Sequence, residues 1–184
     1  SKCYYTHSPK DYYQMQNSVN SFFILGCPRS GTTLLRDILR QDKEIYAPEE
    51  THFYRIAAPY GGVEFMNFYK NNPIMQKHRK LDGVSNGQFG NICDESYTRF
   101  DLACKYSSFV AKSQGAKYWF DKTPQNVYGL PLLLKQFPDA KYLHLVRHPL
   151  SVIKSLMEGK VMRSQSFIGS LNYWLEAVSI IDVM

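Results

Sequence analysis

The chain has 184 residues, of which 44% are hydrophobic and 21% charged, a composition typical of one globular domain with a substantial core. No apolar run approaches the length of about 20 residues that a membrane-spanning helix needs. The net charge of +6 suits an anionic ligand, but the basic residues are scattered apart from a small cluster at Lys77, Arg79 and Lys80, so we expect no nucleic-acid partner.

The first part of the chain predicts a lead-in segment, a buried strand and a helix. Residues 1–21 are polar and Tyr-rich and lack the apolar core of a signal peptide. The apolar run at 22–25 ends at Gly26 and predicts a buried strand. After a short loop, the spacing predicts a helix over 31–40 whose apolar stripe consists of Leu34, Leu35, Ile38 and Leu39.

The middle of the chain predicts a second short strand and several helices. The sequence "EIYAP" at 44–48 predicts a strand that Pro48 stops, and Pro48 then opens a helix with Glu49 and Glu50 in its first turn. Short helical pieces and turn signals alternate over 61–90, which favours a flexible, substrate-facing segment. A longer helix is expected over 94–114, with one face formed by Cys93, Tyr97, Phe100 and Cys104.

The last part predicts two further strands, each followed by a helix. Strands are expected at 117–120 and 141–146, and helices at 130–136, from Pro149 onward and over 167–184. The final helical pattern carries no glycine cap, basic last turn or following proline, so we expect the domain to be incomplete at its C-terminus.

This order of elements predicts a single domain over 1–184 with a three-layer α/β/α, P-loop-like fold around a central parallel sheet. Ligands of such sheets bind beyond the carboxyl ends of the strands. The segments "GCPRSGTT", "PEET", "DKTPQN" and "RHP" all lie at those ends. Their convergence on one edge predicts a single site.

The four cysteines predict neither a zinc site nor a disulfide framework. Cys3, Cys27, Cys93 and Cys104 include no C-x-x-C pair, and Cys93 and Cys104, expected on one helix, could not bridge each other. Free thiols favour a reducing compartment such as the cytoplasm, although a lumenal location stays open. Cys27 is interpreted as a small buried residue, not as a nucleophile.

The loop after the first strand resembles a Walker A loop that lacks its lysine. Gly26 and Gly31 have the Walker A spacing and Thr33 stands at the Ser/Thr position, but Thr32 occupies the lysine position. A glycine-rich turn that enters a helix points backbone N–H groups at an anion, and the hydroxyls of Ser30, Thr32 and Thr33 add donors. The Mg-nucleotide machinery is absent, so we expect no metal. The plainer alternative is a strand-to-helix turn that binds nothing.

Four segments in order resemble the sulfotransferases that use 3′-phosphoadenosine 5′-phosphosulfate (PAPS). "PRSGTTLL" resembles their 5′-phosphosulfate loop, and "YLHLVRHPLSVIKS" resembles their 3′-phosphate segment. "PEETHF" resembles the acidic motif of the protein-tyrosine sulfotransferases and their bacterial relatives, and "DKTP" the segment that carries a catalytic lysine. The chain departs from the family at His148, where an aspartate is common, and the "K-x-H" segment of the cytosolic small-molecule branch is absent.

The resemblance implies a role for each matched position. Glu50 would be the base that removes the acceptor proton, with His52 as the rival base and with helix stabilisation as the plainer interpretation of Glu50. Lys122 would replace the missing loop lysine, and Arg29 would brace the sulfuryl group.

The same resemblance implies two ends of a nucleotide site. The loop residues Arg29, Ser30, Gly31, Thr32 and Thr33 would hold the 5′ end, and Arg147 and Ser155 would hold the 3′-phosphate. For each basic residue, the plainer interpretation is an ordinary surface side chain. Trp119 and Trp174 are interpreted as core residues, with adenine stacking by Trp119 as the alternative.

The function expected from this resemblance is transfer of a sulfuryl group from PAPS, as co-substrate, to a hydroxyl or amine. The acceptor class stays open among peptides, saccharides, lipids and small molecules. Two other functions stay open as well: a non-catalytic anion-binding P-loop module and, with less support, a P-loop kinase.

Overall fold

The computed structural model describes residues 21–55, 58–159 and 166–183, so the predicted lead-in segment and Cys3 lie outside the described residues, apart from Ser21. Five strands are described: β1 (Phe22–Gly26), β2 (Ile45–Tyr46), β3 (Tyr118–Trp119), β4 (Asp121–Lys122) and β5 (Lys141–Leu145). The helices are α2 (Thr32–Leu39), α3 (Val63–Asn71), α4 (Pro73–Leu81), α5 (Asn86–Asp94), α6 (Arg99–Ser113), the 3-10 helix η1 (Pro124–Gly129), α7 (Leu130–Gln136), α8 (Pro149–Glu158) and α9 (Phe167–Asp182).

The central sheet is parallel and has the strand order β4-β1-β5. β1 is the middle strand because its apolar residues are buried on both faces, as expected for a parallel sheet. The predicted strand at 117–120 extends to Lys122: β3 pairs with β2, and β4 then pairs with β1, with Lys122 opposite Ile24. This extension carries Lys122 from the expected loop into the sheet, beside the strand that leads into the anion loop.

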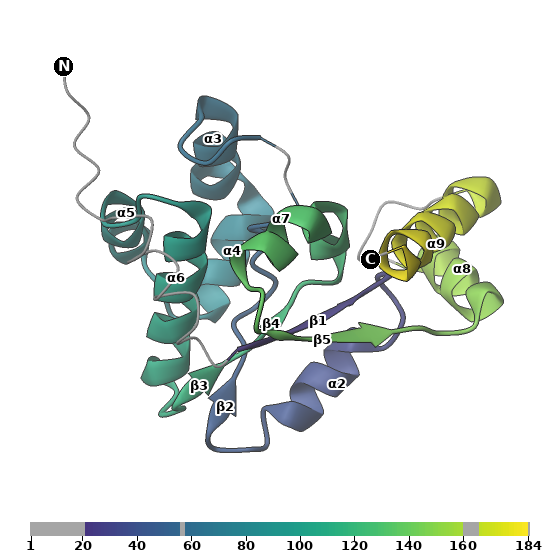
Figure 1. Ribbon diagram of the computed structural model, residues 1–184, viewed down its shortest axis with the longest axis horizontal. Helices are drawn as coiled ribbons and strands as arrows, with labels where there is room; N and C mark the ends of the chain where they lie inside the picture. Colours follow the sequence, from purple (N-terminus) through teal and green to yellow (C-terminus); the bar gives the residue numbers. More distant parts are fainter. Residues whose placement is uncertain (1–20, 56–57, 160–165, 184) are drawn as a thin grey trace.

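Helices cover both faces of this sheet, which confirms the three-layer α/β/α prediction. Figure 1 shows α2 on one side of β1 and β5 and α7 on the other. On the α2 side, Leu35 and Leu39 pack against a small cluster around Ile24 and Phe120. The larger core lies on the opposite face, where aromatic side chains pack edge-on against Phe137.

The predicted apolar stripe of α2 is half wrong. Leu35 and Leu39 face the sheet, but Leu34 is 67% exposed and Ile38 is 58% exposed. The helix is rotated so that Arg36 is buried, with its Nη1 donating to Glu49 Oε2 at 2.8 Å. Because this ion pair turns Arg36 toward the protein interior, Leu34 and Ile38 lie at the surface.

Two further element predictions are corrected. Residues 47–52 contain no helix, because Glu49 pairs with Arg36 and Arg40 instead of capping a first turn. The helix expected over 94–114 is two helices, since Thr98 caps a new one by accepting from the N–H of Asp101. Cys93 and Cys104 therefore lie on different helices, and both are free thiols.

The expected series of short helical pieces over 61–90 is more regular than predicted. It consists of the complete helices α3 and α4 and the start of α5, each with an ordinary N-terminus. Asn72 caps α4 by accepting from the N–H groups of Ile74 and Met75, and Ser85 and Gln88 form a capping box at α5. Whether the segment faces a substrate stays a prediction.

The close approach of β1 to β5 predicts that Gly26→Ala will destabilise the fold. Gly26 has φ 147°, and a Cβ built there would lie 2.6 Å from the carbonyl oxygen of Leu145, which the strand pairing fixes. We expect a loss of about 3 kcal/mol in the free energy of unfolding, measured by urea denaturation.

The matched control is Gly90→Ala within α5. No atom lies within 4 Å of a Cβ built at Gly90. This substitution should stabilise the chain by up to about 1 kcal/mol, because alanine has the better helix propensity. Equal stability of the two variants would contradict the crowding expected at Gly26.

Candidate active site

The carboxyl ends of β1, β4 and β5 bring Lys122, the anion loop and Arg147 to one edge of the sheet. Lys122 is 2% exposed and ends β4. Its Nζ lies 3.4 Å from Oγ1 of Thr33, in the first turn of α2, and 2.5 Å from Oε1 of Glu50. The ammonium group therefore lies between the loop's helix and the carboxylate.

The segment that carries Glu50 is held at both ends. On one side, the backbone N–H of Glu49 donates to Oδ1 of Asp82 at 2.8 Å, and Tyr106 donates to the other oxygen of Asp82 at 2.6 Å. On the other side, the N–H of Thr51 donates to Oγ1 of Thr123 at 2.9 Å. Glu50 is thus placed by neighbours that are themselves fixed.

The Glu49 side chain adds to this support. Burial raises the pKa of Glu49, but its ion pairs with Arg36 and Arg40 outweigh that effect, so the pKa lies below its usual range. The carboxylate is therefore ionised at neutral pH and ties the segment to α2. Glu49 belongs to the scaffold of the site, whereas Glu50 points its carboxylate at Lys122.

Asp121 connects the Glu50 segment to β4. Its Oδ2 accepts from the hydroxyl of Thr51 at 2.6 Å, and its Oδ1 accepts from Nδ2 of Asn126 at 3.1 Å. Burial raises the pKa of Asp121 to about 6, against the opposing effect of the hydrogen bonds from Thr51 and Thr123. Asp121 and Thr123 therefore hold the Glu50 segment against the end of β4.

His52 lies beside Glu50 but is buried. Its Nε2 is 3.6 Å from Oε2 of Glu50, and its ring stacks at 6.0 Å on that of His78. Burial lowers the pKa of His52 to about 4, only partly offset by Glu50. The imidazole is therefore neutral at pH 7. His78, from α4, contacts the same segment through Nδ1, 2.9 Å from the carbonyl oxygen of Glu50.

The loop after β1 has the shape of an anion cradle. Gly31 adopts a left-handed conformation, with φ 99°, at the N-cap of α2, and no side chain caps the helix there. The first N–H groups of α2 have no partner within the helix. Within the described part of the chain, the buried hydroxyl of Ser30 also has no hydrogen-bond partner. These groups fit an anion bound at the helix N-terminus.

Arg29, Arg147 and Ser155 contact one another at the outer side of this loop. Nε of Arg29 donates to Oγ of Ser155 at 2.9 Å, and Nη1 of Arg147 donates to the carbonyl oxygen of Arg29 at 3.3 Å. The structure thus places Arg29 against Ser155, so Arg29 would have to release Ser155 to reach a group near Lys122. The residues expected at the two ends of a nucleotide are neighbours here.

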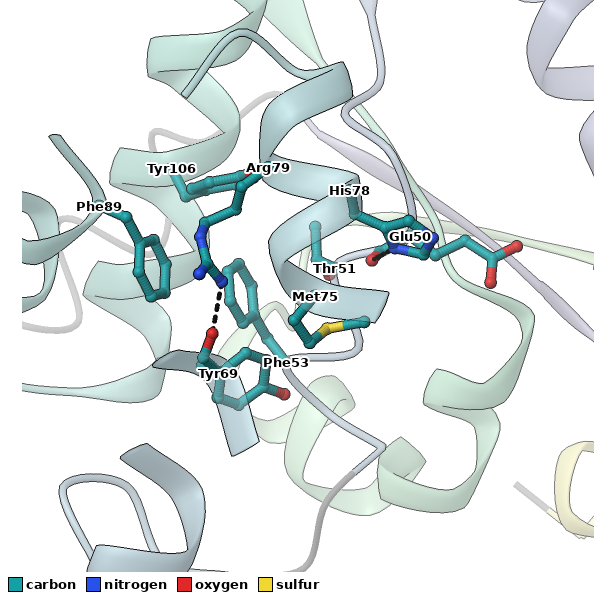
Figure 2. A pocket seen from close by; sticks show the side chains of 9 residues that line it. All are labelled: Glu50, Thr51, Phe53, Tyr69, Met75, His78, Arg79, Phe89 and Tyr106. Atoms are coloured by element: carbon teal, nitrogen blue, oxygen red, sulfur yellow. Dashed lines mark hydrogen bonds between the residues drawn. The ribbon is translucent and has the colours of Figure 1, made fainter. Parts of the chain in front are cut away.

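A small pocket lies behind Glu50. It measures about 10 Å³, about enough for one water molecule, and is lined mainly by side chains of the core. Figure 2 shows the Glu50 carboxylate pointing away from the aromatic side chains of this pocket. The pocket therefore offers no room for an acceptor, which would approach Glu50 from the side of Lys122.

The described residues contain neither a cluster of metal-binding side chains nor a membrane-spanning helix. In the ranges 21–55, 58–159 and 166–183, no group of three histidine, cysteine or acidic side chains is arranged to hold a metal ion. Over the same ranges, no helix has the length and apolar character required to span a membrane.

Comparison with known proteins identifies the family. The family model described as "Sulfotransferase family" matches residues 21–182, which include the loop, Glu50, Lys122, Arg147 and Ser155. The chain belongs to the sulfotransferase family. This agrees with the resemblance of its four motifs.

Two relatives show how much of a sulfotransferase the chain represents. It is 32% identical over 140 residues to nodulation protein NoeE of Sinorhizobium fredii, covering 73% of this chain and 30% of that protein. It is 29% identical over 161 residues to human protein-tyrosine sulfotransferase 1, covering 85% of this chain and 40% of that protein. The chain thus spans less than half the length of each of these two relatives.

Solved sulfotransferase domains share the fold. The domain from the Synechococcus PCC 7002 olefin synthase matches with a TM-score of 0.65 and 22% identity, covering 90% of this chain and 62% of that one. The domain from the curacin biosynthetic pathway matches with a TM-score of 0.55 and 20% identity over the same shares. At this identity the likeness establishes the fold alone.

The structure shows the surroundings of Trp119, Cys27 and Trp174 in this sulfotransferase chain. Trp119 lies in the core, edge-on to Phe23 at 5.9 Å, so its ring is not available to stack on adenine. Burial raises the pKa of the Cys27 thiol to about 12, which agrees with a packing role. Trp174 lies on α9 and is half-buried. Its Nε1 donates to the carbonyl oxygen of Arg147, just after β5, at 3.1 Å.

Sequence reasoning missed the residues that hold the site together. Asp82 and Trp174 lie far from the four motifs in sequence, whereas Gln125 lies within "DKTPQN" but receives no role from the sequence. No local pattern marks them. From the sequence, Glu49 is interpreted only as an acidic residue in the first turn of a helix. Arg36 and Arg40, one helical turn apart, are the sequence signal that could have predicted its ion pairs.

Proposed function

We propose that this chain carries the donor site and the catalytic base of an enzyme that transfers a sulfuryl group from PAPS to a hydroxyl or amine. One observation carries the proposal: the buried ammonium of Lys122 lies 2.5 Å from the Glu50 carboxylate and 3.4 Å from Thr33 at the start of α2. An ammonium group, a carboxylate and the N-terminus of a helix therefore lie at one point, and this arrangement supports the proposal. PAPS, when bound there, supplies the activated sulfuryl group.

The loop would hold the 5′ end of the nucleotide. Its candidates are Ser30, Gly31, Thr32 and Thr33, together with the N–H groups that open α2. The unpartnered, buried hydroxyl of Ser30 supports this assignment, since such a group is costly unless a ligand or water satisfies it. Lys122 takes the place of the missing loop lysine, from the neighbouring strand.

Glu50 would remove the proton of the acceptor. Its side chain is 29% exposed, so an acceptor can reach it, and its Oε1 accepts from the ammonium of Lys122 at 2.5 Å. Lys122, hydrogen-bonded to Glu50 and Thr33, offsets the negative charge that develops as the nucleotide leaves. Arg29 would add to this once its side chain has turned from Ser155.

His52 is a weaker candidate for the base. Its side chain is 5% exposed, and its pKa of about 4 gives it no advantage over a carboxylate at neutral pH. It is better placed to limit where the Glu50 side chain can move. Arg147 and Ser155, at the ends of the Arg29 contacts, would hold the 3′-phosphate.

Calorimetric titration tests the donor site. Without metal, 3′,5′-phosphoadenosine should bind more tightly than 5′-AMP. Arg147→Ala should weaken binding of 3′,5′-phosphoadenosine by about 10- to 100-fold, the value of a hydrogen bond between charged groups, and leave 5′-AMP almost unaffected. A requirement for Mg²⁺ and ATP would instead favour a kinase.

Lys154→Ala is the matched control for this titration. It removes one positive charge from the helix that carries Ser155, next to Ser155 itself. The ratio of the two nucleotide affinities should stay at the wild-type value. Equal weakening of both nucleotides by Arg147→Ala would contradict a 3′-phosphate role for Arg147.

A further inference from the structure

Helix α9 carries two adjacent aromatic residues that bind different segments of the site. Tyr173 accepts a hydrogen bond from Nε2 of Gln125, and Trp174 donates to the carbonyl oxygen of Arg147 at 3.1 Å. Successive residues of a helix point about 100° apart, so neighbouring positions can reach two different segments. Figure 1 shows α9 lying near α8, close to where β5 ends.

The segment contacted by Tyr173 follows β4 directly. Gln125 lies in η1, three residues after Lys122, and is itself buried. The strand pairing of β4 and the contacts of η1 therefore fix Lys122 and Gln125 as one unit. A contact that moves Gln125 moves the segment from which Lys122 projects.

The segment contacted by Trp174 follows β5. Arg147 is exposed, and its backbone carbonyl is held by the indole N–H while its guanidinium donates to the carbonyl oxygen of Arg29. Arg29 in turn donates to Ser155. Trp174 is thus the half-buried end of a chain of contacts that runs through the candidate 3′-phosphate residues.

Packing makes α9 a firm support for both contacts. Tyr173 and Trp174 pack against a cluster that contains Cys27 of the anion loop and Val152 and Leu156 of α8. One helix therefore contacts the loop, the segment after β4 and the segment after β5. These are the three parts that a nucleotide spanning the site would have to find at fixed separations.

We propose that Tyr173 and Trp174 are positioning residues that fix the distance between the Lys122 segment and Arg147. The inference rests on the proposed function, since it concerns the same nucleotide site. Tyr173 would act through Gln125 on the catalytic side, and Trp174 would act through Arg147 on the phosphate side. Neither side chain is assigned a contact with the substrate.

The test compares Tyr173→Phe and Trp174→Phe with wild type, using 3′,5′-phosphoadenosine and 5′-AMP in calorimetry and steady-state kinetics of sulfuryl transfer. Trp174→Phe should lower the preference for the 3′-phosphorylated nucleotide by about 5- to 10-fold, the loss of one net hydrogen bond. Tyr173→Phe should lower kcat with little change in nucleotide affinity. Both variants retain an aromatic ring.

Tyr128→Phe is the matched control. It removes a hydroxyl that links the same two elements, η1 and α9, through Glu176 at 3.4 Å, but it leaves the contacts of Tyr173 with Gln125 and of Trp174 with Arg147 in place. It should change neither the nucleotide preference nor kcat. If it has the same effect as Tyr173→Phe, general loosening of α9 explains both, and the proposal fails.

A double-mutant cycle separates positioning from structural damage. If Trp174 acts through Arg147, Trp174→Phe should have no further effect on the nucleotide preference in an Arg147→Ala background. Additive effects would overturn the proposal. If wild type shows no preference for 3′,5′-phosphoadenosine, the proposed function fails as well. If wild type shows the preference but Trp174→Phe retains it and Tyr173→Phe retains the wild-type kcat, positioning alone is overturned.

Discussion

Replacing Glu50 with glutamine should reduce kcat for sulfuryl transfer by about 10²- to 10⁴-fold, the usual contribution of a positioned general base. Binding of 3′,5′-phosphoadenosine should be unchanged, because the amide oxygen can still accept from Lys122. The measurement is steady-state kinetics beside calorimetric titration of the same preparation. A loss confined to kcat would identify a group that acts on the acceptor proton.

Glu49→Gln is the matched control for the base. Glu49 pairs with Arg36 and Arg40 and does not contact Lys122. Its replacement should therefore lower the free energy of unfolding, whereas kcat should change little. If Glu50→Gln retains full activity and His52→Gln loses it, the base is His52. That outcome would remove Glu50 from the mechanism.

Replacing Lys122 with methionine should reduce kcat/KM by about 10²- to 10³-fold, the cost of removing one preorganised donor from a transition state. The variant should nonetheless fold, because the Glu50 carboxylate that loses its partner is 29% exposed and can be hydrated. A buried charge is expensive to desolvate, and an apolar side chain of similar volume avoids that cost. Kinetics and thermal unfolding of the same variant give both quantities.

Lys112→Met controls for the loss of a positive charge. Lys112 is exposed in the last turn of α6, and its replacement should leave kcat/KM unchanged. If Lys122→Met unfolds the chain, Lys122 is chiefly a structural partner of Glu50. If it folds and keeps wild-type activity, the ammonium contributes nothing to transfer, and the proposed replacement of the loop lysine is wrong.

Local patterns were enough to predict β1, β2, β3 and β5, but not β4. β1 is a short apolar run, and it ends at a glycine that the packing requires. In a chain whose strands alternate with helices, a short apolar run of this kind predicts a buried strand. The parallel arrangement followed from alternation with helices, and it placed the four motifs at one edge of the sheet before any contact was known.

The failures have two different physical causes. The break between α5 and α6 was readable, since Thr98 and Asp101 have the spacing of a capping box. The missing helix after Pro48 was not readable, because the partners that hold Glu49 in an irregular segment, among them Asp82 on a later turn, are set by the tertiary fold. Propensity yields to such contacts when both partners are buried.

The site residues divide in the same way. The sequence motifs predict roles for Glu50 and Lys122 separately. Only the structure, in which β4 extends beside β1, shows that the two side chains form an ion pair. The contact of Trp174 with Arg147 joins residues 27 positions apart, and that of Gln125 with Tyr173 joins residues 48 positions apart. No local sequence pattern predicts either contact.

Two residues of the site have backbone conformations that favour glycine. Arg29 has φ 73° and His52 has φ 54°, and within the described ranges they are the non-glycine residues with positive φ. Each such conformation costs roughly 1 to 2 kcal/mol relative to a relaxed backbone. Glycine at either position would release this strain and remove the side chain. At position 29 the side chain lost would be the one proposed to act on the sulfuryl group, so selection for heat resistance and selection for turnover would act there in opposite directions.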